Sequence, residues 1–136
     1  MAHTAILGSA EKTDEYGWLR FDQPTYQPEF GCTCTFARAG DETSATFTML
    51  DHFRDALVDF AAALARPDLR QDAPLVWESE DSDVRLAVTA DGSHNRVNCV
   101  MRRAPDWAPQ DLGWITVEPA DLRAFAMEMH AFVTGS

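Results

Sequence analysis

The stretch GCTCTFARAGDETSATFTMLDHFRDALVDFAAALAR, residues 31–66, changes its hydrophobic period part-way along and thereby decides the fold. Over residues 31–37 the larger apolar side chains alternate with threonine. Alternation at a period of two places Cys32, Cys34 and Phe36 on one face of an extended chain. This segment is therefore predicted to be a β-strand with one buried face.

The rest of the stretch predicts a hairpin that leads into a helix. Residues 38–43, RAGDET, are typical of a turn, and residues 45–49 predict the return strand. From there the apolar period lengthens to that of an amphipathic helix, which Pro67 ends. The predicted buried stripe of this helix is Phe53, Leu57, Phe60 and Leu64.

Similar patterns lie on both sides of this stretch. Further strands are predicted at residues 5–7, 18–21, 74–80, 84–90, 96–102 and 114–118. Residues 91–95, DGSHN, predict a hairpin turn, and residues 103–113 predict a longer loop. A closing helix begins at Pro119, and its predicted buried stripe is Leu122, Phe125, Ala126, Met129, Phe132 and Val133.

The order of these elements is strands, helix, strands, helix. Strands that are joined by short hairpins pair antiparallel, because parallel neighbours need long crossovers. The sequence thus predicts an α+β fold: an antiparallel β-sheet of about seven or eight strands, with two amphipathic helices packed on one face. The 136 residues are the size of one domain. The buried positions of the first predicted helix recur in the second at a constant offset along the chain. This recurrence indicates two similar halves, about 1–68 and 69–136.

The charge balance restricts the partners. The chain has 22 acidic and 11 basic residues, a net charge of −11. Such a chain repels nucleic acid and anionic membrane surfaces, and it attracts basic proteins. An acidic surface also serves solubility alone. Exposed strand edges additionally allow a homodimer.

The location is predicted to be the bacterial cytoplasm. The first residues lack the basic region and the apolar run of a signal peptide, and no apolar run is long enough to span a membrane. Three cysteines, an odd number, favour a reducing compartment. Lys12 is the sole lysine, and this arginine bias, with abundant alanine and aspartate, indicates a GC-rich bacterial genome.

The cysteines raise the question of a metal site. A C-x-C pair on a strand sets its sulfurs about 7 Å apart along one face, unlike the C-x2-C knuckles of zinc sites. A zinc site at Cys32 and Cys34 would need Cys99 and a histidine such as His52 or His94. We instead expect buried thiols that act as small hydrophobic groups, with no metal and no cofactor.

No catalytic residue can be assigned from motifs. H-E-x-x-H, G-x-S-x-G, G-x-G-x-x-G and the P-loop are all missing. The sequence therefore favours a non-enzymatic role, while a metal-dependent hydrolase that uses acidic residues stays a minor alternative.

Two segments are candidate partner-binding sites. Acidic residues gather in ESEDSD, and a tryptophan is framed by aspartates in the loop that follows. Aromatic residues among charged groups are common at protein–protein hot spots, although acidic turns and loop anchors have the same composition. The candidates are Glu78, Glu80, Asp81, Asp83, Asp106, Trp107 and Asp111.

Residues 45–134 resemble a bacterial family of small acidic proteins that includes WapI-type immunity proteins of polymorphic toxin systems. The positions that carry the resemblance are Phe60, Leu64, Trp77, Glu78, Asp91, Gly92, Leu122, Phe125 and Phe132. The resemblance implies a protein that neutralises a cognate basic toxin by direct binding, and it implies no catalytic residue. The alternative is a self-associating structural protein or a small-ligand carrier, and a pocket lined by Trp18, Phe36 and Trp77 would favour the carrier.

Overall fold

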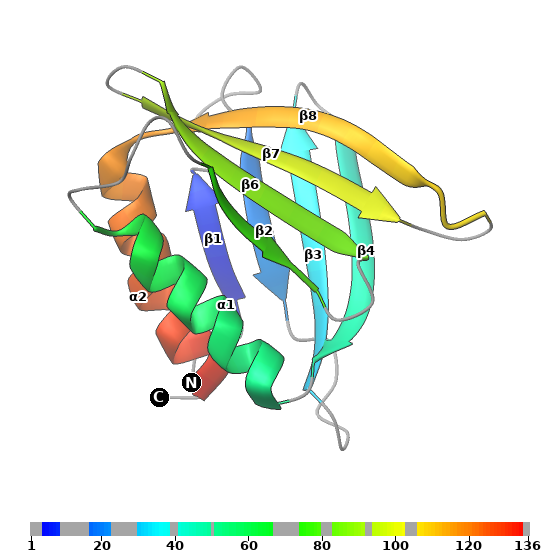
Figure 1. Ribbon diagram of the computed structural model, residues 1–136, viewed down its shortest axis with the longest axis horizontal. Coiled ribbons are helices and arrows are strands. Elements are labelled where there is room, and N and C mark those ends of the chain that lie inside the picture. Colours follow the sequence, from blue (N-terminus) through cyan, green and yellow to red (C-terminus); the bar gives the residue numbers. More distant parts are fainter. Residues whose placement is uncertain are drawn as a thin grey trace.

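The computed structural model describes residues 4–8, 17–22, 30–38, 41–49, 51–66, 74–79, 83–91, 94–102 and 106–134. Eight strands and two helices make up these ranges (Figure 1). The elements are β1 (Thr4–Gly8), β2 (Trp18–Asp22), β3 (Phe30–Arg38), β4 (Asp41–Met49), α1 (Asp51–Leu64), β5 (Leu75–Glu78), β6 (Val84–Asp91), β7 (His94–Arg102), β8 (Pro109–Val117) and α2 (Pro119–Thr134).

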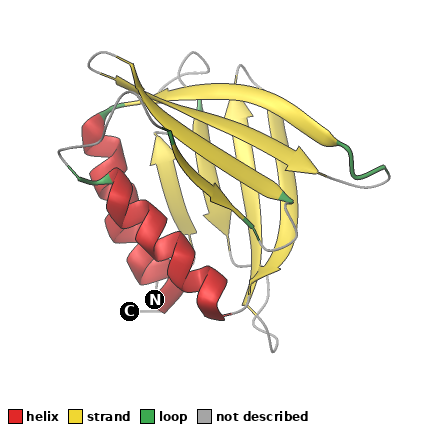
Figure 2. Ribbon diagram, viewed as in Figure 1, coloured by secondary structure: helices red, strands yellow, loops and turns green. Residues whose placement is uncertain are grey.

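The strands form two antiparallel sheets, one in the order β1-β2-β3-β4 and the other in the order β5-β6-β7-β8. The predicted α+β class, the antiparallel pairing and the order of strands and helices are confirmed (Figure 2). The expected sheet of seven or eight strands is divided in two. Each sheet is followed by one helix, so four strands and a helix occur twice along the chain. The boundary expected between residues 68 and 69 lies outside the described residues.

Three hairpins are tighter than the sequence indicated. The predicted turn 38–43 includes the first residues of β4, the predicted turn 91–95 includes the start of β7, and the predicted loop 103–113 includes the first half of β8. At these positions exposed polar side chains continue the strand, so the apolar alternation fades before the backbone pairing does. Pro109 fits because it opens β8, and a first residue need not donate to the ladder.

Aromatic side chains join the two sheets and the helices into one core. Strands of the second sheet run across those of the first (Figure 1). The Trp77 ring lies 5.9 Å from the rings of both Phe21 and Phe47, which belong to the first sheet. Phe125 of α2 lies 6.0 Å from Phe21. Burial of such large rings is the main favourable term that holds sheets and helices together.

The helices lie side by side along one side of the molecule, as Figure 1 shows. Leu57, Phe60 and Leu64 of the predicted α1 stripe are buried, and Leu122, Phe125, Met129 and Phe132 are the buried members of the α2 stripe. The side chain of Phe53 is outside the described part. At the start of α2 the Glu118 amide donates to Asp121 Oδ2 at 2.9 Å, which satisfies an amide next to the positive helix end. Neither described helix is long and apolar enough to cross a membrane.

A glycine fixes the place where β8 crosses the first sheet. Gly17, just before β2, has a φ of +74°, a left-handed conformation that suits glycine. A Cβ at this position would overlap Ile115 Cγ2 of β8 and lie 2.7 Å from the Ala37 carbonyl oxygen of β3. The absence of a side chain therefore lets β8 pack closely on the first sheet, and β8 carries part of the site described next.

Candidate functional site

The cysteines lie in the core. Cys32 and Cys34 of β3 and Cys99 of β7 are buried and unoxidised. Burial raises the pKa of all three thiols, to about 12 for Cys99, so they stay protonated at neutral pH. Over the described residues, no group of three or more His, Cys, Asp or Glu is placed to hold a metal ion. The thiols fill space in the core, as the alternation with threonine indicates.

The candidate partner-binding residues meet at one end of the second sheet. β5 ends and β6 begins there, and β7 ends and β8 begins at the same end. The Arg102 amide of β7 donates to the Asp83 carbonyl oxygen at 2.9 Å, which ties the two turns together. We call this the acidic end and define it by Glu78, Asp83, Asp106 and Asp111. Glu80 and Asp81 lie outside the described residues.

The carboxylates of the acidic end differ in their partners. Glu78 faces Arg85 with a nitrogen–oxygen distance of 3.8 Å. Both side chains are over 40% exposed, so this pair contributes little to stability. Ser79 closes the turn beside them, because its hydroxyl accepts from the Val84 amide at 3.1 Å. This turn is therefore held by its backbone and Ser79, and Glu78 remains at the surface.

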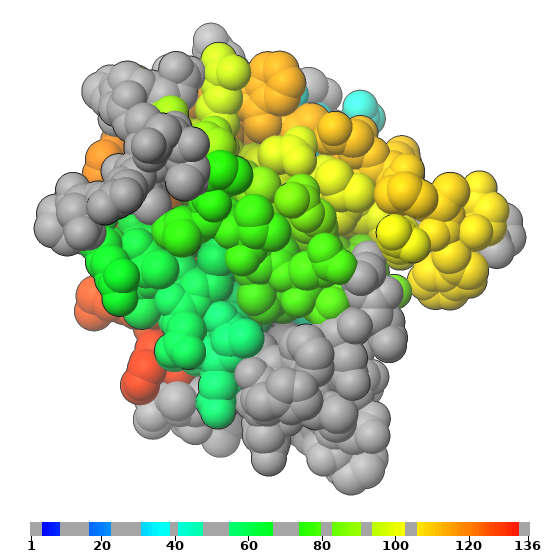
Figure 3. All heavy atoms as spheres, in the orientation of Figure 1, coloured from blue at the N-terminus to red at the C-terminus, as the bar shows by residue number. Residues whose placement is uncertain are grey.

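The side chain of Trp107 is exposed just before β8 begins. Its side chain is 54% exposed, and its φ of +57° is the left-handed conformation that a bulky residue rarely adopts. The Asp106 carboxylate accepts from the Ala108 amide at 3.3 Å and closes a local turn around the tryptophan. In Figure 3 the residues on either side of the β7–β8 connection project from the body of the molecule. More than half of the Trp107 side chain is therefore accessible to a partner.

Asp111 stabilises an irregularity in β8. The β7–β8 register shifts between Asn98 and Val100, and Gly113 has a φ of +90°. Asp111 Oδ1 accepts from the Gly113 amide at 2.9 Å and from Asn98 Nδ2 at 3.0 Å. These two hydrogen bonds, the Gly113 one first, lower the pKa of Asp111. The carboxylate is therefore ionised as well as fixed in position, as bulges commonly fix side chains near binding sites.

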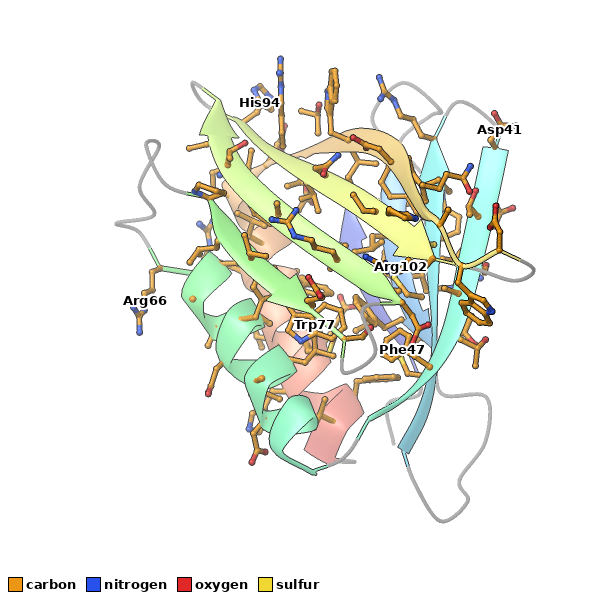
Figure 4. The ribbon with its side chains drawn as sticks, turned by 45° about the vertical axis from the view of Figure 1, so that its right-hand side comes forward. Asp41, Phe47, Arg66, Trp77, His94 and Arg102 are labelled. Carbon is orange, nitrogen blue, oxygen red and sulfur yellow. The ribbon has the colours of Figure 1, made fainter. Side chains whose placement is uncertain are left out.

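A cavity of about 500 Å³ opens between this part of β8 and the beginning of β4. Its walls include Phe36, Arg38, Asp41, Glu42, Asp111 and Leu112. Figure 4 shows Asp41 where β4 begins, near the margin of the molecule. The volume is within the range of about 300–1,000 Å³ typical of ligand sites. The cavity thus borders the acidic end at Asp111, and its wall carries two further carboxylates, those of Asp41 and Glu42.

Sequence reasoning missed Asp41 and Glu42 because they were assigned to a solvated turn. In fact they open β4, and the register of the β3–β4 hairpin carries them to the cavity. Neither side chain has a hydrogen bond or ion pair to another residue of the described ranges. The one available signal was the acidic pair itself, which is common at turns and carried no information about the opposite sheet.

Arginine lies close to these carboxylates and is held against a tryptophan. The guanidinium groups of Arg38 and Arg96 each lie 5.1 Å from the Trp114 ring centre. The ring is 42% exposed, so this stacking lies at the surface. Gly113 leaves room for it, since a Cβ there would be 3.1 Å from Arg38 Nη1. Stacking thus keeps the Arg38 charge on the wall of the cavity.

Trp18, Phe36 and Trp77, whose common pocket would favour a ligand carrier, do not line one pocket. Leu19, not Trp18, pairs with Phe36, so Trp18 lies on the opposite face of the sheet from Phe36. Trp18 stacks there against Arg20, 5.0 Å from the ring centre. Trp77 is buried in the aromatic core, where its Nε1 lacks a hydrogen-bond partner within the described residues. Figure 4 shows Trp77 and Phe47 close together between the sheets.

No protein-family model matches the sequence, and no curated protein matches it either. The resemblance to immunity proteins therefore gains no support from these comparisons.

Proposed function

We propose that this protein is a non-catalytic acidic binding protein of the immunity type, which neutralises a cognate basic toxin by direct binding in the bacterial cytoplasm. The observation that carries the proposal is a group of carboxylates at the acidic end and on the cavity that borders it. Glu78, Asp83, Asp106 and Asp111 belong to the acidic end, and Asp41 and Glu42 line the cavity together with Asp111.

Charge supports this assignment because the cluster is part of a surface with a net charge of −11. Two carboxylates of the cavity have no partner in the described residues, and a third is fixed by the bulge. An acidic, partly preorganised surface steers a basic protein and raises its association rate. Arg38 lies on the wall of the cavity and Arg85 lies beside Glu78, so this surface offers pairing for both signs, with carboxylates in the majority.

Shape supports it through Trp107. A large ring that projects beside carboxylates can enter a pocket of the partner, and tryptophan is enriched among the residues that dominate binding energy. The left-handed backbone at Trp107 matters because strained positions persist where the surrounding structure holds them, often at functional sites. Trp107 lies two residues before β8, and β8 carries Asp111 and Leu112 of the cavity wall.

The test is binding and protection with the basic protein encoded next to this chain's gene. We expect co-expression to restore growth and the purified proteins to bind with an affinity that falls as salt rises. A triple variant, Asp41→Asn with Glu42→Gln and Asp111→Asn, should raise the Kd at least tenfold, since close charge pairs contribute about 1.5–7 kcal/mol.

The control neutralises two acidic residues elsewhere. Asp55→Asn with Asp59→Asn removes two exposed carboxylates of α1, on a different part of the surface. This variant should change the Kd no more than about threefold, because exposed charges outside an interface contribute within about 0.5 kcal/mol. Equal losses in both variants would mean that net charge, and not the group of carboxylates on the cavity, is recognised. Absence of binding and of protection would refute the proposed function.

The cavity also favours a second candidate, a carrier of a small ligand. Its size suits such a ligand, although its walls carry more charge than the mainly apolar lining of typical pockets. Native mass spectrometry of protein purified from its own host distinguishes the two. A bound small molecule that the triple variant loses would favour the carrier.

A further inference from the structure

Among the described strands, one outer strand differs from the other three in its sequence and its pairing. The outer strands of the two sheets are β1, β4, β5 and β8. β1 contacts α2, and its Ile6 amide donates to Glu128 Oε1 at 3.0 Å. β5 contacts α1, and β8 contacts β1. β4 contacts α1, which follows it in the chain, but among the described strands it pairs only with β3, and in Figure 1 it is the strand of the first sheet farthest from the helices.

β4 also lacks the features that protect a strand edge. Its nine residues, DETSATFTM, pair with β3 in continuous register without a bulge. They contain neither proline nor lysine, and both charges are in the first two positions. β8, by contrast, begins with Pro109 and carries a bulge. A long, regular and mostly neutral edge is a template for another strand.

We propose that a second copy of this chain pairs with β4 across a two-fold axis, so that the two first sheets form one continuous eight-stranded sheet. The greatest antiparallel overlap of β4 with itself is centred on Ala45. In that register Ser44 of each copy lies opposite Thr46 of the other. The outer-face hydroxyl pairs within one chain, Thr33 with Thr46 at 2.9 Å and Thr35 with Ser44 at 2.8 Å, then continue across the axis. Such cross-strand pairs stabilise antiparallel sheets.

This register also separates like charges. Asp41 of each copy lies opposite Met49 of the other, so the two Asp41 residues are roughly 27 Å apart at about 3.4 Å per residue. That distance exceeds the Debye length of about 8 Å at physiological salt. A two-fold contact of this kind uses the β4 edge of both copies and therefore stops at a dimer.

Salt separates this association from the proposed toxin binding, on which it does not depend. Each copy carries −11, so the copies repel one another over long range. Between about 0.1 and 1 M salt the Debye length falls from about 10 to 3 Å. We therefore expect salt to strengthen the dimer, whereas it weakens binding of a basic partner.

The test is sedimentation velocity of the full chain over a range of concentrations at both salt levels. We expect a monomer–dimer equilibrium whose dimer fraction rises with salt. Thr46→Asp places a carboxylate on the β4 edge of each copy. In the dimer this carboxylate would lie near Glu42 and the matching new carboxylate of the other copy, so the variant should raise the dimer Kd at least tenfold. Thr33→Asp breaks the same hydroxyl pair and adds the same charge to the same face, but on the inner strand β3, so it should change the Kd no more than about threefold.

A chain that stays monomeric at every concentration and both salt levels would overturn the proposal, as would a trimer or an equal effect of the two variants. Amide hydrogen exchange of the wild-type chain gives a second readout that needs no variant. Protection of residues 44–48 should rise with protein concentration, while protection of β7, inside the second sheet, should not. Unchanged protection in β4 would also overturn it.

Discussion

Gly17→Ala tests whether the crossing of β8 over the first sheet depends on close contact. Two terms add in this variant. Alanine in a left-handed conformation costs about 1–2 kcal/mol. The new Cβ would also overlap Ile115 Cγ2 and lie 2.7 Å from the Ala37 carbonyl oxygen, and overpacking of this kind costs about 1–3 kcal/mol. The free energy of unfolding should therefore fall by about 2–5 kcal/mol.

Urea denaturation followed by tryptophan fluorescence measures this loss, and Gly113→Ala is the matched control. Gly113 has a similar φ of +90°, but a Cβ there would meet only Arg38 Nη1, at 3.1 Å, the end of a flexible side chain. The control should lose about 1–2 kcal/mol, the conformational term alone. In an Ile115→Ala background Gly17→Ala should lower the free energy of unfolding by less, because the Ile115 Cγ2 atom that the new Cβ would overlap is absent. Equal losses at Gly17 and Gly113 would refute the close-contact argument.

Three further predictions concern the core and the site. Because the pKa of Cys99 is raised from 9.0 to about 12, its contribution to stability is complete below pH 9 and is lost as pH rises towards 12. The free energy of unfolding of the wild type should therefore fall between pH 8 and 10, and in Cys99→Ala this fall should be smaller by about 1.4 kcal/mol, measured by urea denaturation. Asp111 has a lowered pKa, so its contribution is present above its ordinary value of 3.8 and disappears as pH falls through the folded-state pKa; acid titration of Asp111→Asn should show a smaller loss of stability than the wild type over that range. Phe125→Ala should lower the free energy of unfolding by about 3–5 kcal/mol, since its ring is fully buried beside Phe21, and a loss below about 1 kcal/mol would contradict the packing.

The main elements of the fold could be predicted because their buried faces leave a periodic pattern. Cys32, Cys34 and Phe36 alternate with threonine, and Leu57 and Leu64 recur at helical spacing, so each local structure follows from where apolar groups stand. The division into two sheets could not be predicted in this way. Hairpins specify which strands are neighbours along the chain, but they do not specify whether the fifth strand joins the fourth.

The sequence also indicates part of the candidate site, for a related reason. ESEDSD and the Trp107 segment stand out as charged and aromatic runs, and the pairing of β6 with β7 and β7 with β8 brings their two turns to one end. Asp41 and Glu42 reach the cavity only because the two sheets cross there, which is long-range information. The role of Asp111 in the bulge depends on Asn98, on the neighbouring strand, and on Gly113. A single sequence shows none of these contacts.

The two proposed associations use different parts of one strand. The start of β4 carries Asp41 and Glu42 and faces the cavity, whereas residues 44–49 are uncharged and form the unprotected edge. Had the carboxylates been in the middle of β4, self-pairing would set them directly across the two-fold axis, where like charges oppose pairing. Placed at its end, they are separated in the dimer and remain open to a basic partner. The position of the charge along β4 therefore makes toxin binding and self-association compatible, and their opposite responses to salt allow each to be measured alone.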